Sequence, residues 1–353
     1  MKRFLIAAGP IAFALFVAAL PIGAQQAPLK VFISVDMEGL AGVVAGADVS
    51  PTGRDYAHFR AIMAAETNAA IDGAFAAGAR EFVVRDSHGD KTNLLPGDLN
   101  RSGVVLIRGA STGPKNMMEG IDASFGAAIF IGYHAKAGTP NAILEHTSNG
   151  NVIDFSVNGV SLPEGGYNAL VAGLYKVPVV FAAGDRALTE QLKGLLGSIE
   201  TAAVKEEIGG DASRGLSPRD AQALIGAGVE RGVRNRAQMK PFTMAGPYTM
   251  VLKVRQEKPP YKGAERTGSG EFRFTSPDLL EVLNAFNAMK EAAWRASSSS
   301  RAPVAALVRL PRNLRARAGT TCASTTGRIA RRRRQRWRPS LPAAAGPSPL
   351  PPM

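Results

Sequence analysis

The sequence predicts an α/β protein with an open, mostly parallel sheet flanked by helices and a metal site at the C-terminal ends of the strands. Short apolar runs alternate with an amphipathic helix pattern, which is the arrangement of βαβ units. Three of the first four apolar runs also end directly in side chains that can ligate a metal ion. A second α/β region is expected to follow the first.

The N-terminal segment 1–24 is typical of a signal peptide. Lys2 and Arg3 precede an apolar run over residues 4–20, which ends in small residues up to Ala24. The alternative is an uncleaved anchor of about 17 residues, at the short limit for a membrane span. No cysteine follows the run, so a lipoprotein anchor is not expected. We expect a periplasmic or secreted protein without a stable membrane span after cleavage.

The C-terminal segment 297–353 differs sharply in composition from the rest. It holds 12 arginines, no acidic residue and a proline-rich end, and it lacks a periodic apolar pattern. We expect a disordered Arg/Pro-rich tail; a functional basic arm and a frameshifted end are the alternatives. The formal net charge is +13, but the chain between the two terminal segments carries 28 basic and 29 acidic side chains. A nucleic-acid partner is therefore not expected.

Cysteine and histidine are scarce, which limits the chemistry of any metal site. Cys322, the only cysteine, lies in the basic tail. This excludes an intrachain disulfide and a thiolate zinc site, so a metal would need histidines and carboxylates. Of the four histidines, His58 lies within a helix pattern among charged residues and is interpreted as a surface residue.

The first predicted unit comprises residues 28–186 and opens with a buried strand. The apolar run 29–35 leads straight into Asp36 and Glu38. Residues 55–77 then carry apolar side chains at the spacing of one helix face.

The next strands have similar ends. The run 81–84 leads to His88, 104–107 is a third strand, and 127–132 leads to His134. In open α/β sheets the ligand crevice lies beyond the carboxyl ends of the strands, so these side chains are expected to converge.

Each of these residues also has a simpler interpretation. Asp36 could cap the following segment, His88 could be a solvated loop residue, and His134 could be a satisfied core histidine. The arrangement of all of them at strand ends favours a functional site over any one of these alternatives.

Further candidates follow the fourth strand. His146 comes twelve residues after His134. Residues 152–157 form a predicted strand before the Asn158–Gly159 hairpin turn. Glu164 then begins a helix, where its charge also suits the helix dipole.

The region 187–296 is expected to be a second α/β region. It contains a helix pattern over 217–232, strand patterns over 248–254 and 271–275, and a closing helix from 276 to 294. It contains no new ligand cluster, so we interpret it as scaffold and oligomer contacts.

The candidate ligands are rich in oxygen and contain nitrogen but no sulfur, which suits zinc, manganese or cobalt. Five ligands are too many for one tetrahedral structural zinc and suit a dinuclear catalytic site with room for water. The set comprises Asp36, Glu38, His88, His134 and Glu164.

In combination these motifs resemble a known family. The segments are Ser34-Val-Asp-Met-Glu-Gly39, Asp86-Ser-His-Gly89, Gly132-Tyr-His-Ala135, Glu145-His-Thr147, Asn158-Gly159 and Glu164-Gly-Gly-Tyr-Asn168. Their order and spacing are similar to those of the zinc-dependent D-aminopeptidases of the dipeptide-transport-protein type, over roughly residues 30–293.

The resemblance implies roles for individual residues. It implies that the five ligands hold two Zn²⁺ ions, with Asp36 bridging them, and that His146 is catalytic as nucleophile or as general acid or base. It also implies short peptide substrates with an N-terminal D-residue and a homo-oligomer, a decameric ring of two pentamers. The export signal and the basic tail depart from the family pattern.

The leading hypothesis is therefore an exported dinuclear zinc D-aminopeptidase that uses an activated water assisted by His146. One alternative is a periplasmic peptide- or metal-binding protein without turnover. Another is a different dinuclear metallohydrolase, such as an amidase. The only cysteine lies in the basic tail, which disfavours thiol hydrolases.

Overall fold

The computed structural model describes residues 27–210 and 212–291. All of them belong to one compact unit. The predicted signal peptide 1–24 and the predicted tail 297–353, with Cys322, lie outside the described residues, as does the end of the predicted closing helix.

A seven-stranded sheet forms the centre of the fold, with the strand order β3-β2-β1-β4-β7-β8-β9. Its neighbouring strands pair in parallel, except that β9 runs antiparallel to β8. The predicted open, mostly parallel sheet is thus confirmed. The strands are β1 (Leu29–Val35), β2 (Ala79–Asp86), β3 (Val104–Ile107), β4 (Ala127–Tyr133), β7 (Val179–Asp185), β8 (Glu200–Gly209) and β9 (Ala212–Gly215).

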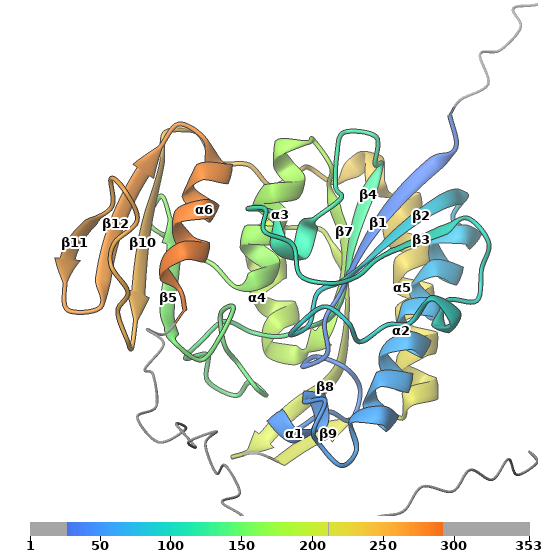
Figure 1. The fold of residues 1–353 in the computed structure, drawn as a ribbon. Helices are drawn as coiled ribbons and strands as arrows, with labels where there is room; N and C mark the ends of the chain where they lie inside the picture. Colours follow the sequence, from blue (N-terminus) through green and yellow to red (C-terminus); the bar gives the residue numbers. More distant parts are fainter. Residues whose placement is uncertain (1–26, 211, 292–353) are drawn as a thin grey trace, which may run out of the picture. The chain divides into compact units, whose positions relative to one another are not determined.

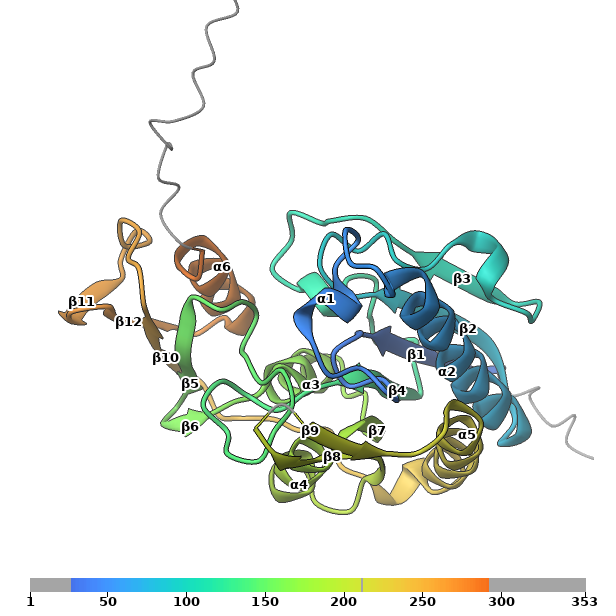
Figure 2. The ribbon, with the colours of Figure 1, turned by 90° about the horizontal axis from the view of Figure 1, so that it is seen from below.

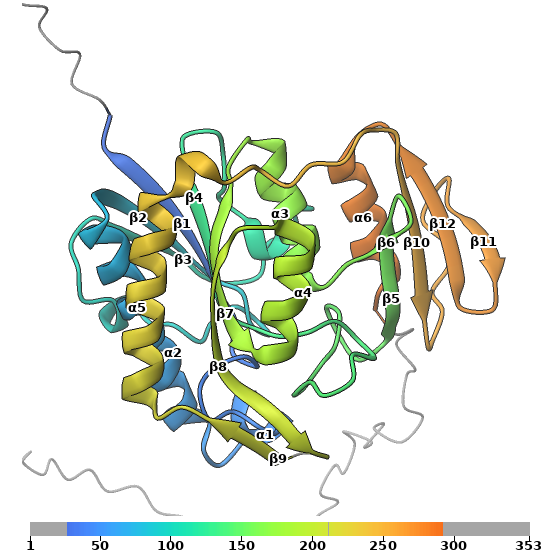
Figure 3. The same ribbon diagram turned by 180° about the vertical axis from the view of Figure 1, so that it is seen from behind.

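Helices cover both faces of this sheet (Figures 1 and 3). On one face α2 (Tyr56–Ala76) packs against α5 (Pro218–Arg234). On the other face lie α3 (Glu164–Leu174) and α4 (Arg186–Leu196). The four-residue helix α1 (Gly46–Val49) precedes α2.

Alternation along the strands builds two separate cores. In β1, Val31 and Ile33 point into the cluster formed with α2 and α5. Phe32, between them, points into the cluster formed with α3 and α4. A strand that is buried on both faces reads as a continuous apolar run, which is why these strands are recognisable in the sequence.

A second sheet, entirely antiparallel, has the order β11-β12-β10-β5-β6 and is accompanied by α6 (Leu279–Met289) (Figure 2). The strands are β5 (Val152–Val157), β6 (Val160–Ser161), β10 (Tyr248–Val254), β11 (Glu265–Gly268) and β12 (Glu271–Ser276).

The two sheets are not divided at residue 187, where the sequence pattern suggested a second region to begin. β8 and β9 come after this point and extend the first sheet, whereas β5 and β6 come before it and belong to the second. Both regions therefore contribute to both sheets. Within the described residues, no helix combines the length and apolar character needed to cross a membrane.

Candidate metal centre

The predicted ligands lie at one end of the parallel sheet. Asp36 directly follows β1, His88 lies two residues after β2, and His134 directly follows β4. Because β1 lies between β2 and β4, the carboxyl ends of the three strands are adjacent. Residues that are 52 and 98 positions apart in the chain thereby share one site, as the strand pattern predicted.

Two glycines allow the strand ends to approach each other closely. The Gly39 amide donates a hydrogen bond to the Gly132 carbonyl, 2.8 Å away. A Cβ on Gly39 would lie 1.9 Å from the Tyr133 carbonyl oxygen, and a Cβ on Gly132 would lie 2.1 Å from that of Asp36. Gly132 also has a φ of +69°, which disfavours other residues. The close approach that brings Asp36 beside His134 therefore requires glycine at both positions.

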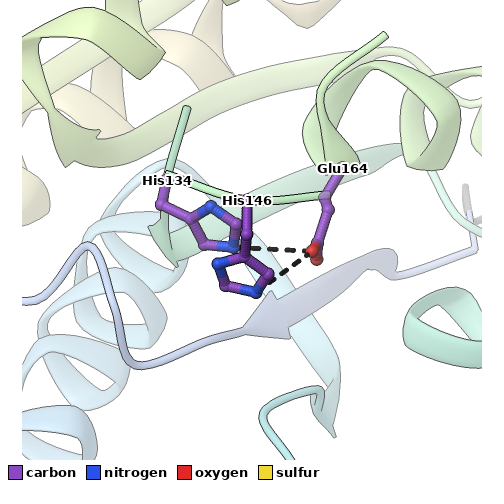
Figure 4. Close-up of side chains that lie close together, drawn as sticks. All are labelled: His134, His146 and Glu164. Carbon is purple, nitrogen blue, oxygen red and sulfur yellow. Dashed lines mark ion pairs between the residues drawn. The ribbon is translucent and has the colours of Figure 1, made fainter. Parts of the chain in front are cut away.

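The site contains two groups of three potential ligands. In the first, His88 Nδ1 lies 3.2 Å from Asp36 Oδ1 and 3.0 Å from Glu38 Oε2. In the second, Glu164 Oε1 lies 3.5 Å from His134 Nε2 and 3.7 Å from His146 Nε2 (Figure 4).

Asp36 faces both groups. Its Oδ1 lies 3.2 Å from His88 Nδ1, and its Oδ2 lies 3.7 Å from His134 Nε2. One carboxylate thus offers an oxygen to each group, which is the arrangement that a bridging ligand needs.

Hydrogen bonds to the backbone orient all three histidine rings. In each ring, one nitrogen faces the carboxylates and the other faces a backbone carbonyl. Because a carbonyl oxygen only accepts, the second nitrogen carries the proton and the first keeps a lone pair for a metal. The pairs are His88 Nε2 with Val49 O at 2.9 Å, His134 Nδ1 with Ala135 O at 3.0 Å, and His146 Nδ1 with Leu144 O at 2.9 Å.

The charge balance of the site fits divalent cations. Asp36, Glu38 and Glu164 are all buried, and among the described residues none forms an ion pair with a lysine or arginine. His134 Nε2 is fully buried and has no hydrogen-bond partner among the described residues. Buried carboxylates and an unpartnered imidazole nitrogen are costly unless a cation joins them, and O and N donors without sulfur suit zinc.

Without a metal, protons take the place of that cation. Burial would lower the pKa of His88, but the charge of Glu38 and hydrogen bonds to both carboxylates raise it to about 11. Burial likewise opposes the charged form of His134, yet Glu164 raises its pKa to about 10. Burial alone would raise the pKa of Glu38 and Glu164, but the neighbouring histidines hold both below their usual range.

Residues outside the ligand set hold the ligand loops. The Lys205 ammonium, on β8, donates to the backbone carbonyls of Glu38 and Val43. Glu66 Oε1, on α2, accepts from the Ala41 amide at 3.0 Å. The loop that carries Asp36 and Glu38 is therefore attached to both α2 and β8. This role of Lys205 is not predictable from the sequence, because a lysine inside a strand does not reveal its contacts.

His146 lies within the second group of potential ligands, beside His134 and Glu164. Its ring stacks on that of His134, with centroids 3.9 Å apart and an interplanar angle of 14°. Its side chain is 26% exposed and lines the cleft, whereas that of His134 is fully buried. This position is compatible with catalysis and with metal ligation. His58, by contrast, is exposed on α2, as expected.

The site opens into a cleft of about 390 Å³. Several polar residues that the sequence did not single out also line it, among them Lys91, Ser111 and Lys290. Lys290 directly follows α6, where a lysine is ordinarily explained by the helix dipole. No sequence signal distinguishes these residues from solvated lysines and loop serines.

Comparison with known proteins agrees with this geometry. The family described as D-aminopeptidase matches residues 29–288, which is most of the chain. The chain belongs to the D-aminopeptidase family. The resemblance inferred from the motifs and the prediction of an enzyme are thereby confirmed.

One curated relative and one solved structure extend the comparison. A D-aminopeptidase of Bacillus subtilis (strain 168) is 36% identical over 279 residues, covering 76% of this chain and 99% of the relative. The solved structure is the Zn-dependent D-aminopeptidase DppA from Bacillus subtilis, described as a self-compartmentalizing protease. It superposes with a TM-score of 0.71 at 34% identity, again covering 76% of this chain and 99% of its own. The fold of the described residues is thus that of this family.

Proposed function

We propose that the protein is a zinc-dependent D-aminopeptidase that releases the N-terminal residue of short peptides at a dinuclear site. The observation that carries the proposal is the pair of ligand groups joined by Asp36, in a chain that belongs to the D-aminopeptidase family. The zinc dependence and the D-specificity of the substrate come from the names of the two relatives.

The residues fit two metal sites that share one ligand. Asp36, Glu38 and His88 would hold one ion. His134 and Glu164 would hold the other together with Asp36, whose Oδ2 lies 3.7 Å from His134 Nε2. Zinc bound there would supply Lewis acidity, which polarises the scissile carbonyl and acidifies water.

His146 Nε2 is the candidate proton carrier. Its Nδ1 proton is committed to the Leu144 carbonyl, so Nε2 is the nitrogen with a free lone pair. This atom faces the cleft beside Glu164 and can accept a proton from the attacking water. It can then return the proton to the leaving amine nitrogen as the carbon–nitrogen bond breaks.

The direct test compares mirror-image substrates on the zinc-loaded, full-length chain. D-alanine p-nitroanilide is expected to be hydrolysed with a kcat/KM at least about 100-fold above that of L-alanine p-nitroanilide. A chelator should abolish the activity, and added zinc should restore it. Equal rates for the two enantiomers would contradict the D-specificity, and activity that survives complete metal removal would contradict the zinc site.

We further propose that the protein is exported and that it assembles into a homo-oligomer. The support for export is the basic and apolar segment 1–24. The support for assembly is the self-compartmentalizing relative. Mass spectrometry of the mature protein tests the export: a chain that begins at Gln25 is expected, and an intact Met1 in the mature protein would contradict it.

A further inference from the structure

The cleft that holds the metal ligands also contains positive groups without a counter-charge. Lys91 and Lys290 both line it, together with Ser111. Neither lysine forms an ion pair with a carboxylate of the described residues. The cleft thus contains cationic side chains besides the carboxylates of the ligands and of Glu291, which also lines it.

Lys290 is the least solvated of these groups. The residue is only 8% exposed. Its backbone is firmly held, because its amide donates to the Phe286 carbonyl at 2.9 Å and its carbonyl accepts from Asn151 Nδ2 at 3.0 Å. Its ammonium lies 5.3 Å from the centre of the Phe286 ring but has no hydrogen-bond partner within residues 27–210 and 212–291.

The surroundings of Lys290 make its isolation costly. Burial lowers the pKa of its ammonium, Glu291 and Glu164 partly offset this effect, and the charge of Lys91 lowers the pKa further. Two ammonium groups thus influence each other in one cleft. A buried cation without an anion, next to a second cation, is unfavourable unless a ligand brings a negative charge.

A second unpartnered donor lies in the same cleft. The Ser111 hydroxyl is buried and lacks a hydrogen-bond partner among the residues with defined positions. Ser111 belongs to the loop between β3 and the short helix at Asn116–Met118, and Asn287 of α6 donates to Pro114 of this loop at 3.5 Å. The loop and the end of α6 therefore adjoin, and a residue of each lines the cleft.

We propose that Lys290, Lys91 and Ser111 form a subsite for the C-terminal carboxylate of a short peptide. The inference rests on the proposed peptidase function and specifies its substrate class. A dipeptide or tripeptide carries a carboxylate within a few residues of the scissile bond, whereas a long chain presents only neutral peptide groups there. Ammonium and hydroxyl donors bind a carboxylate through charge-assisted hydrogen bonds, which are stronger than neutral ones.

The test compares D-alanyl-D-alanine with its C-terminal amide, which lacks the negative charge but keeps the same scissile bond. In the zinc-loaded, full-length protein, we expect kcat/KM to favour the free acid by about 10- to 100-fold, mainly through KM. Lys290→Gln should bring this ratio close to one, and Lys290→Arg should retain most of it. Lys193→Gln removes a positive charge from the exposed side of α4, outside the cleft, and should leave the ratio unchanged.

The possible outcomes distinguish a failure of the proposed subsite from a failure of the proposed peptidase activity. Equal kcat/KM for acid and amide in the wild type would overturn the subsite and leave the peptidase function standing. If neither compound is hydrolysed, the proposed function fails, and calorimetric binding of both compounds then tests the subsite. Tighter binding of the acid than of the amide, lost in Lys290→Gln, supports the subsite. Equal binding of the two compounds overturns the subsite. If Lys290→Gln does not fold, Lys91→Gln must reduce the same ratio; an unchanged ratio in that variant overturns the subsite.

Discussion

Asp36 is the residue on which the dinuclear interpretation depends. Its two oxygens face His88 and His134, which belong to different ligand groups. A carboxylate that bridges two ions contributes a bond to each, so its loss weakens both sites at once.

We therefore predict that Asp36→Ala loses more zinc than any other single ligand substitution. Elemental analysis of the purified variant should find less than one zinc per chain. Glu38→Ala, which removes a ligand of one group only, is the matched comparison and should keep about one. Two ions retained in Asp36→Ala would remove the bridging role.

The second residue-scale prediction concerns His146. If it transfers a proton without binding metal, His146→Ala should keep its zinc and lose about 10²- to 10⁴-fold in kcat. The proximity of its Nε2 to Glu164, 3.7 Å, makes ligation the competing role. A zinc loss equal to that of His88→Ala would identify His146 as a ligand. Unchanged kcat would exclude it from the mechanism.

At the scale of single elements, the central strands of the parallel sheet were predictable from the sequence, whereas the strands β8 and β9 at its edge were not. The strands β1, β2 and β4 are buried on both faces, so their apolar runs and the ligands at their ends stand out in the sequence. β8 and β9 were not expected, because β8 mixes buried and half-exposed positions and β9 is short and mostly exposed.

The supporting contacts of the site could not be predicted for a related reason. Lys205 and Lys290 lie far from the ligands in sequence, and each resembles an ordinary charged residue of its element. Only the folded chain shows that one holds a ligand loop and the other faces the cleft. Ligand types at strand ends leave a sequence pattern, whereas hydrogen bonds between distant elements do not.

Gly132 tests the close approach of β1 and β4. We predict that Gly132→Ala lowers the free energy of unfolding by at least about 2 kcal/mol, because a methyl group would meet the Asp36 carbonyl in addition to the unfavourable φ. Gly138→Ala is the matched control, since Gly138 has a φ of +74° but an added Cβ there would have no atom within 4 Å. Urea unfolding of both metal-free variants measures the difference. Equal losses of unfolding free energy in the two variants would show that the close approach of β1 and β4 does not contribute to stability.

Glu66 on α2 should make stability depend on pH. Burial raises its pKa to about 7, although the Ala41 amide and Lys205 act against this, whereas the ordinary value is 4.5. The folded chain therefore keeps a proton that the unfolded chain releases first, and Glu66 destabilises the fold progressively as the pH rises from 4.5 to 7.

In Glu66→Gln this destabilisation is absent. The melting temperature of the variant minus that of the wild type should increase between pH 4.5 and 7 and stay constant above pH 7. Scanning calorimetry of both proteins with a chelator present measures it, with Glu190→Gln, an exposed position on α4, as the control. A difference that does not change with pH would refute the raised pKa.

At the scale of the whole molecule, the family match and the described structure coincide. The match covers residues 29–288, and the structure describes residues 27–291 with one gap. The additional segments of this chain thus lie outside the part that it shares with its relatives.

Light scattering of the purified mature chain tests the assembly. If the chain assembles as a decameric ring, the mass in solution should be ten times that of the mature polypeptide, and it should not fall on moderate dilution. A monomeric mass at which the peptidase activity is complete would show that assembly is not needed for function.

We propose that two zinc ions share this site and that both are needed for peptide hydrolysis. The most direct measurement adds zinc stepwise to the metal-free, full-length chain and follows the hydrolysis of D-alanyl-D-alanine. We predict that activity reaches its plateau at two equivalents of zinc per chain, with two ions found by elemental analysis at that point. Full activity at one equivalent, with one bound ion, would contradict it.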